Sequence, residues 1–241
     1  MDAKNILAVD TSSRVLSIAI SATLRGGQAG NRALFEANLE GTPRHSEQLI
    51  GLVQEGLSRL GLKKNELDEF IWGLGPGSFT GLRIGLSVLK GFHLGFGKKA
   101  FGASSLDLIA LGSGMASGEL IVCVDARRER IYTAIYRFRN GAAKKVLEDC
   151  ALSLDQLLRK IKAGTVLTGD ALVPYGDLIR KKLGEKALFL KPSFWYPRAL
   201  FLTHLYEGKR QWLKPLSLRT MVPQYLRISE AEEKLSRRKK K

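Results

Sequence analysis

The chain has 241 residues, of which 39 are Lys or Arg and 23 are Asp or Glu, giving a formal charge of +16. With 44% apolar residues it can bury a hydrophobic core, which excludes a globally disordered chain. No apolar run approaches the ~20 residues that a membrane-spanning helix needs, and the first residues lack a signal-peptide pattern.

The charge is unevenly distributed. Residues 1–105 carry a net charge of +3 and residues 106–241 a net charge of +13. This asymmetry favours a polyanionic partner, nucleic acid before membrane. The alternative is that the charge serves solubility alone. Cys123 and Cys150 lie in apolar strand-like segments, which predicts buried thiols in a reducing compartment and hence a cytoplasmic protein.

The first part of the chain predicts the order strand, strand, strand, helix, strand, helix, strand. The helix signals are specific: Thr42 suits an N-cap, Pro43 suits the first helical position, and Gly61 suits the end of the same helix. The expected ranges are strands at 5–10, 15–23, 33–39, 69–74 and 99–102, and helices from 42 to 61 and from 82 to 96.

After a linking helix at about 105–112, the same order of elements recurs. The expected ranges are strands at 120–125, 130–138, 144–150, 165–168 and 187–190, and helices at 154–161 and 171–183. The repeat predicts an α/β protein of two similar lobes facing a cleft, at 1–104 and 105–228. The pattern leaves open whether a C-terminal helix near 200–213 packs back on the first lobe. A basic tail at 229–241 is expected to be disordered.

Each lobe begins with a strand that ends in an acid, Asp10 in the first and Asp125 in the second. Beside the hydroxyls of Thr11 and Ser12, such a carboxylate could orient a metal-bound phosphate. The alternative is a hairpin in which Asp and Ser cap the local backbone.

The segment from Gly73 to Gly85 is rich in glycine, but it has neither the Gly-Lys-Ser/Thr ending of a P-loop nor the G-x-S-x-G pattern of a nucleophile elbow. Gly77, Gly81 and Gly85 are four residues apart, so they lie on one face of a helix start. Small residues there allow another backbone to approach closely, and a stripe of Leu82, Leu86 and Leu89 could add to that face. The alternative is packing against the lobe's own sheet.

The histidines, His45, His93 and His204, are far apart in the sequence, and no zinc motif is present. Basic residues are spread over the second part of the chain, with aromatic residues among the later ones, which suits either a phosphate-contacting face or a solvated surface. The basic groups are Arg127-Arg128, Arg137, Arg139, Lys144-Lys145, Arg159-Lys160-Lys162 and Arg180-Lys181-Lys182.

With these motifs in this order, the chain resembles the TsaB (YeaZ) family, a bacterial subunit of the machinery that makes threonylcarbamoyladenosine in tRNA. The matching segments are Ile6 to Ser12, His45 to Leu49, Gly75 to Gly85, Lys90-Gly91, Val124 to Arg128, Gly169 to Ala171 with Tyr175, and Pro223 to Arg227.

The resemblance implies a duplicated actin/Hsp70/sugar-kinase (ASKHA) fold, two lobes each with a five-stranded mixed sheet and helices. In that fold, the residues at the nucleotide cleft would be Asp10, Thr11, Ser12, Asp125, Gly169 and Asp170. The turn at 10–13 lacks the glycine usual in the phosphate turn of this superfamily. The expectation is therefore that no cofactor is required and that ATP or ADP binds weakly.

The resemblance also implies a non-catalytic scaffold and activator of the catalytic subunit TsaD, which transfers threonylcarbamoyl to N6 of adenosine 37 in tRNAs reading codons that begin with A. The ATPase subunit TsaE and tRNA would join through the complex, and a homodimer would form when TsaD is absent. TsaD carries a histidine pair for metal that this chain lacks. The expected partner interface consists of His45, Leu49, Val53, Gly81, Leu82, Arg83, Gly85, Leu86 and Leu89.

The tail residues Arg237, Arg238, Lys239, Lys240 and Lys241 are candidates for contacts with tRNA phosphates. Two rival functions remain at this stage. One is a phosphotransferase or glycopeptidase-like hydrolase of the same superfamily, and the other is a tRNA-binding module driven by charge.

Overall fold

The computed structural model describes residues 4–23, 32–41, 45–208 and 210–226, apart from the side chains of residues 45–47 and 185. The predicted helix opening at Thr42 and Pro43, and the predicted tail at 229–241 with Arg237 to Lys241, lie outside the described residues.

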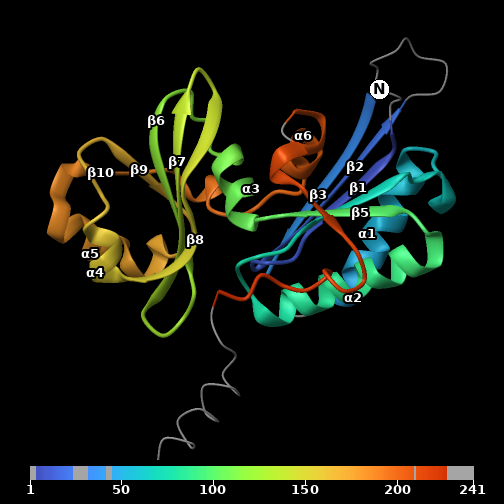
Figure 1. Cartoon of the computed structure of the whole chain (residues 1–241), viewed down its shortest axis with the longest axis horizontal. Coiled ribbons are helices and arrows are strands. Elements are labelled where there is room, and N and C mark those ends of the chain that lie inside the picture. Colours follow the sequence, from blue (N-terminus) through green and yellow to red (C-terminus); the bar gives the residue numbers. More distant parts are fainter. Residues whose placement is uncertain (1–3, 24–31, 42–44, 209, 227–241) are drawn as a thin grey trace, which may run out of the picture.

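The described chain forms two sheets, one in each of two lobes (Figure 1). The first sheet has the order β11-β5-β4-β1-β2-β3, and the second has the order β10-β9-β6-β7-β8. The strands of the first sheet are β1 (Ile6–Asp10), β2 (Val15–Thr23), β3 (Arg32–Glu40), β4 (Glu69–Gly73), β5 (Lys99–Ala103) and β11 (Lys214–Leu216). Those of the second are β6 (Gly118–Asp125), β7 (Arg130–Arg139), β8 (Ala142–Ser153), β9 (Thr165–Thr168) and β10 (Ala187–Phe189).

The two sheets confirm the predicted duplication. β1 pairs antiparallel with β2 and parallel with β4, and β6 pairs in the same way with β7 and β9. β2 with β3 and β7 with β8 are antiparallel, while β4 with β5 and β9 with β10 are parallel. Five strands of each lobe therefore have the same order and the same directions.

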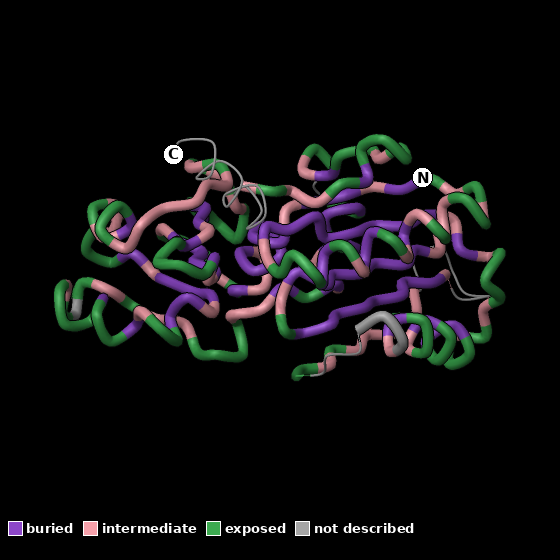
Figure 2. The backbone as a smooth tube through the Cα atoms, turned by 90° about the horizontal axis from the view of Figure 1, so that it is seen from below, coloured by how far each residue is buried: buried purple, intermediate pink, exposed green. Residues whose placement is uncertain are grey.

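Helices cover both faces of each sheet, so the central strands β1, β2, β4 and β6 are largely buried on both sides, as their continuous apolar runs predict. In Figure 2 the strands of the first lobe are largely purple, and exposed segments lie on the outside. The helices are α1 (His45–Arg59), α2 (Phe79–Phe96), α3 (Ser105–Gly112), α4 (Leu154–Leu158), α5 (Leu172–Leu183) and α6 (Leu200–Gly208). Short 3-10 helices occupy Lys64–Glu66, Gly184–Lys186, Pro192–Phe194 and Arg210–Trp212.

Alternate residues of β1 lie in different cores. Leu7 and Val9 pack in the core that contains side chains of α1 and α2. Ile6 and Ala8 pack in the core that contains side chains of α3 and α6. Because side chains along a strand alternate between faces, α1 and α2 cover one face of the first sheet, and α6 with part of α3 covers the other.

The C-terminal segment corrects one expectation and answers one question that the sequence left open. The first sheet has six strands and not five, because β11 pairs antiparallel with β5. The helix α6 contacts β1, β2 and β4, so it packs on the first lobe. The C-terminal helix thus packs back on the first lobe, the arrangement that the sequence left open. The apolar face of α6 explains this return, because Leu202 and Leu205 are buried there. Among the described residues, no helix is long and apolar enough to cross a membrane.

Candidate functional site

The carboxylate of Asp10 is closed off from solvent at the end of β1. Its Oδ1 accepts hydrogen bonds from the Ser12 backbone N–H (2.8 Å) and the Ser12 hydroxyl (2.7 Å), and its Oδ2 accepts one from the Ser105 hydroxyl (2.6 Å). Asp10 and Thr11 are 0% exposed and Ser12 is 4% exposed. The structure therefore favours the backbone-capping interpretation of this turn.

Glycines of the following segment close around the same turn. A side chain at Gly73 would collide with the Asp10 carboxylate, and one at Gly77 would collide with the Ser12 carbonyl. A side chain at Gly81 would meet the Thr11 carbonyl, and one at Gly85 would meet the Thr11 hydroxyl. The four-residue spacing thus serves contact with the protein's own β1–β2 turn.

This packing determines whether Asp10, Thr11 and Ser12, the first-lobe residues of the predicted cleft, are accessible to a nucleotide. Burial raises the pKa of Asp10, although hydrogen bonds from Ser105 and Ser12 oppose the rise. Both carboxylate oxygens accept hydrogen bonds inside the protein and Asp10 is 0% exposed, so in this structure the carboxylate presents no solvent-facing side to a metal-bound phosphate. Asp10, Thr11 and Ser12 are therefore enclosed by the fold, and their role in a nucleotide site stays a prediction.

The second half of the predicted cleft is a set of interacting polar groups. The Asp125 backbone N–H donates to Asp170 Oδ1 (2.9 Å), so these two predicted residues lie together. Asp125 Oδ1 accepts from the Arg127 backbone N–H (2.8 Å), and Asp125 Oδ2 forms an ion pair with Arg127 (3.2 Å). Gly169 has φ +112°, and a side chain there would collide with the Cys123 carbonyl. These contacts give Asp125, Gly169 and Asp170 structural roles.

Arg14 and Tyr196 form a contact between the lobes that the sequence did not predict. The Arg14 guanidinium lies 4.9 Å from the centre of the Tyr196 ring, and it forms an ion pair with Glu40 (2.6 Å). Burial raises the pKa of Asp170, while the charges of Arg127 and Arg14 oppose the rise. No sequence motif marks Tyr196, because it approaches Arg14 only through the tertiary fold.

The predicted partner interface needs correction. Most of its members fill the core of their own lobe: Leu49, Val53, Leu82, Leu86 and Leu89 are each at most 4% exposed, and Gly81 and Gly85 are buried. They are buried because this face of α1 and α2 packs on the first sheet, the alternative that spacing could not exclude. Arg83 is exposed, and His45 begins α1 with its side chain outside the described part.

The exposed faces of the two helices carry a different set of small residues. On α2, Ser87, Gly91 and Gly95 are exposed at four-residue spacing, and on α1 Gly51 is exposed. A side chain built at any of the three glycines meets nothing within 4 Å. Leu94, 68% exposed, lies among them on α2. Gly91 lies six positions after Gly85 in the sequence. On an α-helix this places Gly91 about 240° around the helix axis from Gly85, so the exposed glycines lie on a different face of α2 from the buried ones.

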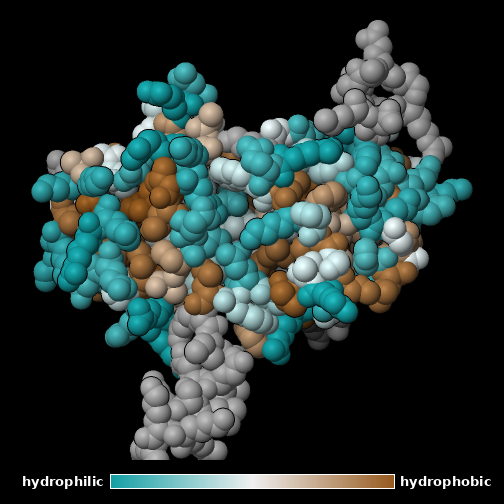
Figure 3. Space-filling model, in the orientation of Figure 1, coloured by the Kyte–Doolittle hydropathy of each residue, from teal (hydrophilic) through white to brown (hydrophobic). Residues whose placement is uncertain are grey.

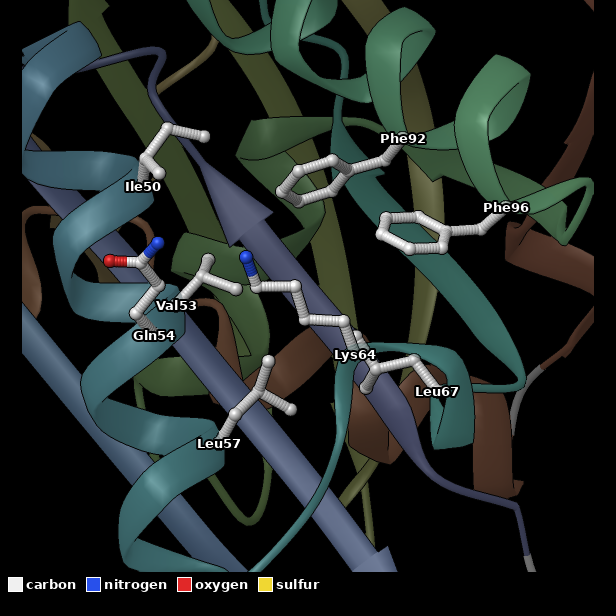
Figure 4. Close-up of a pocket in the computed structure, with 8 residues that line it drawn as sticks. All are labelled: Ile50, Val53, Gln54, Leu57, Lys64, Leu67, Phe92 and Phe96. Carbon is white, nitrogen blue, oxygen red and sulfur yellow. The ribbon is translucent and has the colours of Figure 1, made fainter.

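A small pocket opens between α1 and α2. Figure 4 shows Phe92 and Phe96 of α2 pointing toward α1, with Lys64 crossing the space between the helices. The other lining residues are Ile50, Val53, Gln54 and Leu57 of α1 and Leu67 before β4. Its volume is about 90 Å³.

The described histidine side chains have local roles. His93 Nδ1 contacts the Lys98 carbonyl (2.8 Å) near the end of α2, and His204 packs edge-on against Phe201 (5.5 Å between ring centres). No group of three or more His, Cys, Asp or Glu side chains able to hold a metal occurs within the described residues.

Two sheets with one repeated strand order, joined through α3, define a class of duplicated, two-lobed α/β proteins. A family model described as "TsaD: tRNA N6-adenosine threonylcarbamoyltransferase" matches residues 40–182, more than half of the chain. The chain belongs to this family, and within it to the TsaB/YeaZ group.

Similar proteins cover most of the chain. The tRNA threonylcarbamoyladenosine biosynthesis protein TsaB of Bacillus subtilis is 28% identical over 95% of this chain and 96% of its own length. The TsaB of Escherichia coli is 33% identical over 56% of this chain and 57% of its own. The fold is similar to that of YeaZ from Pseudomonas aeruginosa, with a TM-score of 0.70, 19% identity, and coverage of 93% of this chain and 100% of that one.

Proposed function

We propose that this chain acts in the biosynthesis of threonylcarbamoyladenosine in tRNA, as a non-catalytic subunit that binds and activates a catalytic subunit of the TsaD type. The names of its full-length relatives support the pathway. The observation that carries the binding role is the exposed face of α1 and α2, where Gly51, Gly91 and Gly95 leave open space.

Helices of a partner protein can approach the exposed face of α1 and α2 closely, because small residues allow two helix backbones to come together. Leu94 and the pocket beside Phe92 and Phe96 supply apolar surface that a partner helix would cover. The expected occupant is a pair of equivalent helices on the catalytic subunit. A second copy of this chain would use the same face when that subunit is absent.

The non-catalytic assignment rests on the site geometry. Asp10 has both oxygens bonded inside the protein and is 0% exposed, so a phosphotransferase or hydrolase that depends on it has no accessible carboxylate. We expect the chain to act without a nucleotide of its own. ATP hydrolysis would come from a TsaE-type subunit of the complex, and tRNA would bind through the complex.

The binding role predicts that Gly91→Leu breaks the complex and leaves the fold intact. Gly91 is exposed in the middle of α2 with nothing within 4 Å of an added side chain, and Leu favours helix over Gly by up to about 1 kcal/mol. The affinity of the purified chain for the TsaD-type subunit should fall at least about tenfold, measured by calorimetry alongside thermal unfolding.

The matched control is Gly208→Leu, which places the same side chain into open space on α6. Its affinity should equal that of the unaltered chain. Equal binding by Gly91→Leu would show that the exposed α1–α2 face is not the docking site. Failure of the unaltered chain to bind any TsaD-type subunit would reject the subunit role itself.

A further inference from the structure

One residue near the C-terminal end of the described chain bonds to both lobes. The Gln224 backbone N–H donates to the Leu74 carbonyl (2.8 Å), just after β4 in the first lobe. The Gln224 side-chain amide donates to Asp149 Oδ2 (3.0 Å) on β8 in the second lobe. Pro223 to Tyr225 therefore form a connection between the lobes that is separate from α3.

The next residue joins this connection to the start of α2. The Tyr225 ring lies 5.1 Å from the Phe79 ring, and the Tyr225 hydroxyl accepts a hydrogen bond from Arg83 Nε (3.2 Å). The Arg83 guanidinium in turn lies 3.9 Å from the centre of the Phe79 ring. Phe79 is the first residue of α2, so the C-terminal segment holds the first turns of the proposed partner-binding helix.

The second-lobe end of the connection is a buried ionic network. Lys145 pairs with Asp149 (2.8 Å) and with Asp107 of α3 (2.6 Å), and Asp107 also accepts from the Tyr136 hydroxyl (2.7 Å). The side chains of Lys145, Asp107 and Asp149 are 13%, 6% and 4% exposed. Buried charges of this kind are costly to separate, so Asp149 offers Gln224 a fixed acceptor.

The same network reaches the linking helix. Asp107 lies on α3, and Ser105, at the start of α3, donates to Asp10 of the first lobe. The segment at 223–225 thus joins the two lobes in addition to α3 and to the chain that returns to the first lobe before α6. The segment at 223–225 contacts α2 through Tyr225.

From this arrangement we infer that Gln224 and Tyr225 are positioning residues that couple the partner-binding helix α2 to the second lobe. The inference rests on the proposed function for the identity of the partner. Because linkage is reciprocal, a partner that restrains the start of α2 also restrains β8 around Asp149, through Tyr225 and Gln224.

The test is hydrogen exchange on the full chain, free and bound to the TsaD-type subunit. In the free chain, Gln224→Ala should speed exchange in residues 79–86 and near Asp149 about tenfold, the size expected for loss of one hydrogen bond to a charged group. In the complex, the unaltered chain should show partner-induced slowing in both α2 and β8. With Gln224→Ala, the slowing should persist in α2 and disappear in β8.

Two further variants separate coupling from general loosening. Val222→Ala changes a side chain that is 53% exposed in the same segment and should behave like the unaltered chain. Gln224→Lys returns a donor to Asp149 and should restore the response of β8. An unchanged β8 response in Gln224→Ala, or no rescue by Gln224→Lys, would overturn the inference. Absence of any binding by the unaltered chain would instead reject the proposed function, while the free-chain comparison would still decide the coupling.

Discussion

At the scale of single residues, Asp10 is an ionisable carboxyl group that is buried away from solvent. Its hydrogen bonds to Ser12 and Ser105 offset only part of the desolvation, so its pKa in the folded protein is raised. In the unfolded chain the same carboxyl titrates near its ordinary value. The folded state therefore binds the Asp10 proton more tightly than the unfolded state does.

This difference predicts how stability changes with pH. The contribution of Asp10 to the free energy of unfolding is fully present below the unfolded pKa and is lost as pH rises through the raised folded pKa. Relative to Asp10→Asn, the unaltered chain should gain stability as pH falls from 7 toward 4, by at most about 1.4 kcal/mol per pH unit. Urea unfolding at several pH values measures it. Asp177→Asn, at an exposed residue, is the control, and parallel curves for Asp10→Asn and the unaltered chain would contradict the prediction.

At the scale of elements, α2 carries glycines on two faces, one buried against the β1–β2 turn and one exposed to solvent. Its inner face brings Gly81 and Gly85 against Thr11, and its outer face leaves Gly91 and Gly95 in open space. Ser78 begins the helix by accepting a hydrogen bond from the Gly81 N–H (3.2 Å), which is why α2 starts at Phe79 and not at Leu82 as predicted.

The two faces predict opposite effects of one substitution. Gly85→Ala would push a methyl group into Thr11 and Trp72, so it should destabilise the chain by about 2 kcal/mol or more. Gly91→Ala adds a better helix former in open space and should be neutral or stabilising by up to about 1 kcal/mol. Chemical unfolding of both variants measures this difference. If Gly85→Ala were as stable as Gly91→Ala, the inner-face packing would be disproved.

At the scale of the whole molecule, the basic last turn of α5 lies in the second lobe, whereas α1 and α2 lie in the first (Figure 1). The last turn of α5 carries Arg180, Lys181 and Lys182. Of these, Lys182 pairs with Asp155 (3.3 Å) and Arg180 lies over Phe189 (4.7 Å). In the view of Figure 3, hydrophilic side chains surround the apolar patches of both lobes.

This separation predicts a lobe-specific salt dependence of tRNA binding by the assembled complex. Lys181→Glu in the second lobe should lower the slope of log affinity against log salt by about 1, because one phosphate contact is lost. Lys99→Glu in the first lobe, also exposed, should leave it unchanged. Equal slopes for both variants would indicate that the basic residues of α5 serve solubility and do not contact tRNA. Deletion of residues 236–241, measured in the same assay, tests how much the tail contributes to tRNA binding.

The sequence by itself determined the repeated order of elements. Hydrophobic periodicity and turn residues are local signals, and they located β2, α3 and both halves of the duplication. The long glycine-rich motif carried the family resemblance for the same reason, since the motif is contiguous and ordered.

Only the tertiary structure decided which residues of each motif pack inside the protein and which are exposed to solvent. Gly77, Gly81 and Gly85 form a regular pattern in the sequence, but the β1–β2 turn that they contact is itself enclosed by the fold. β11 joins the first sheet from more than 100 residues beyond β5, and Gln224 reaches Asp149 from the other lobe. Such contacts form between segments that are far apart in the sequence. Local sequence patterns do not specify which distant segments come into contact.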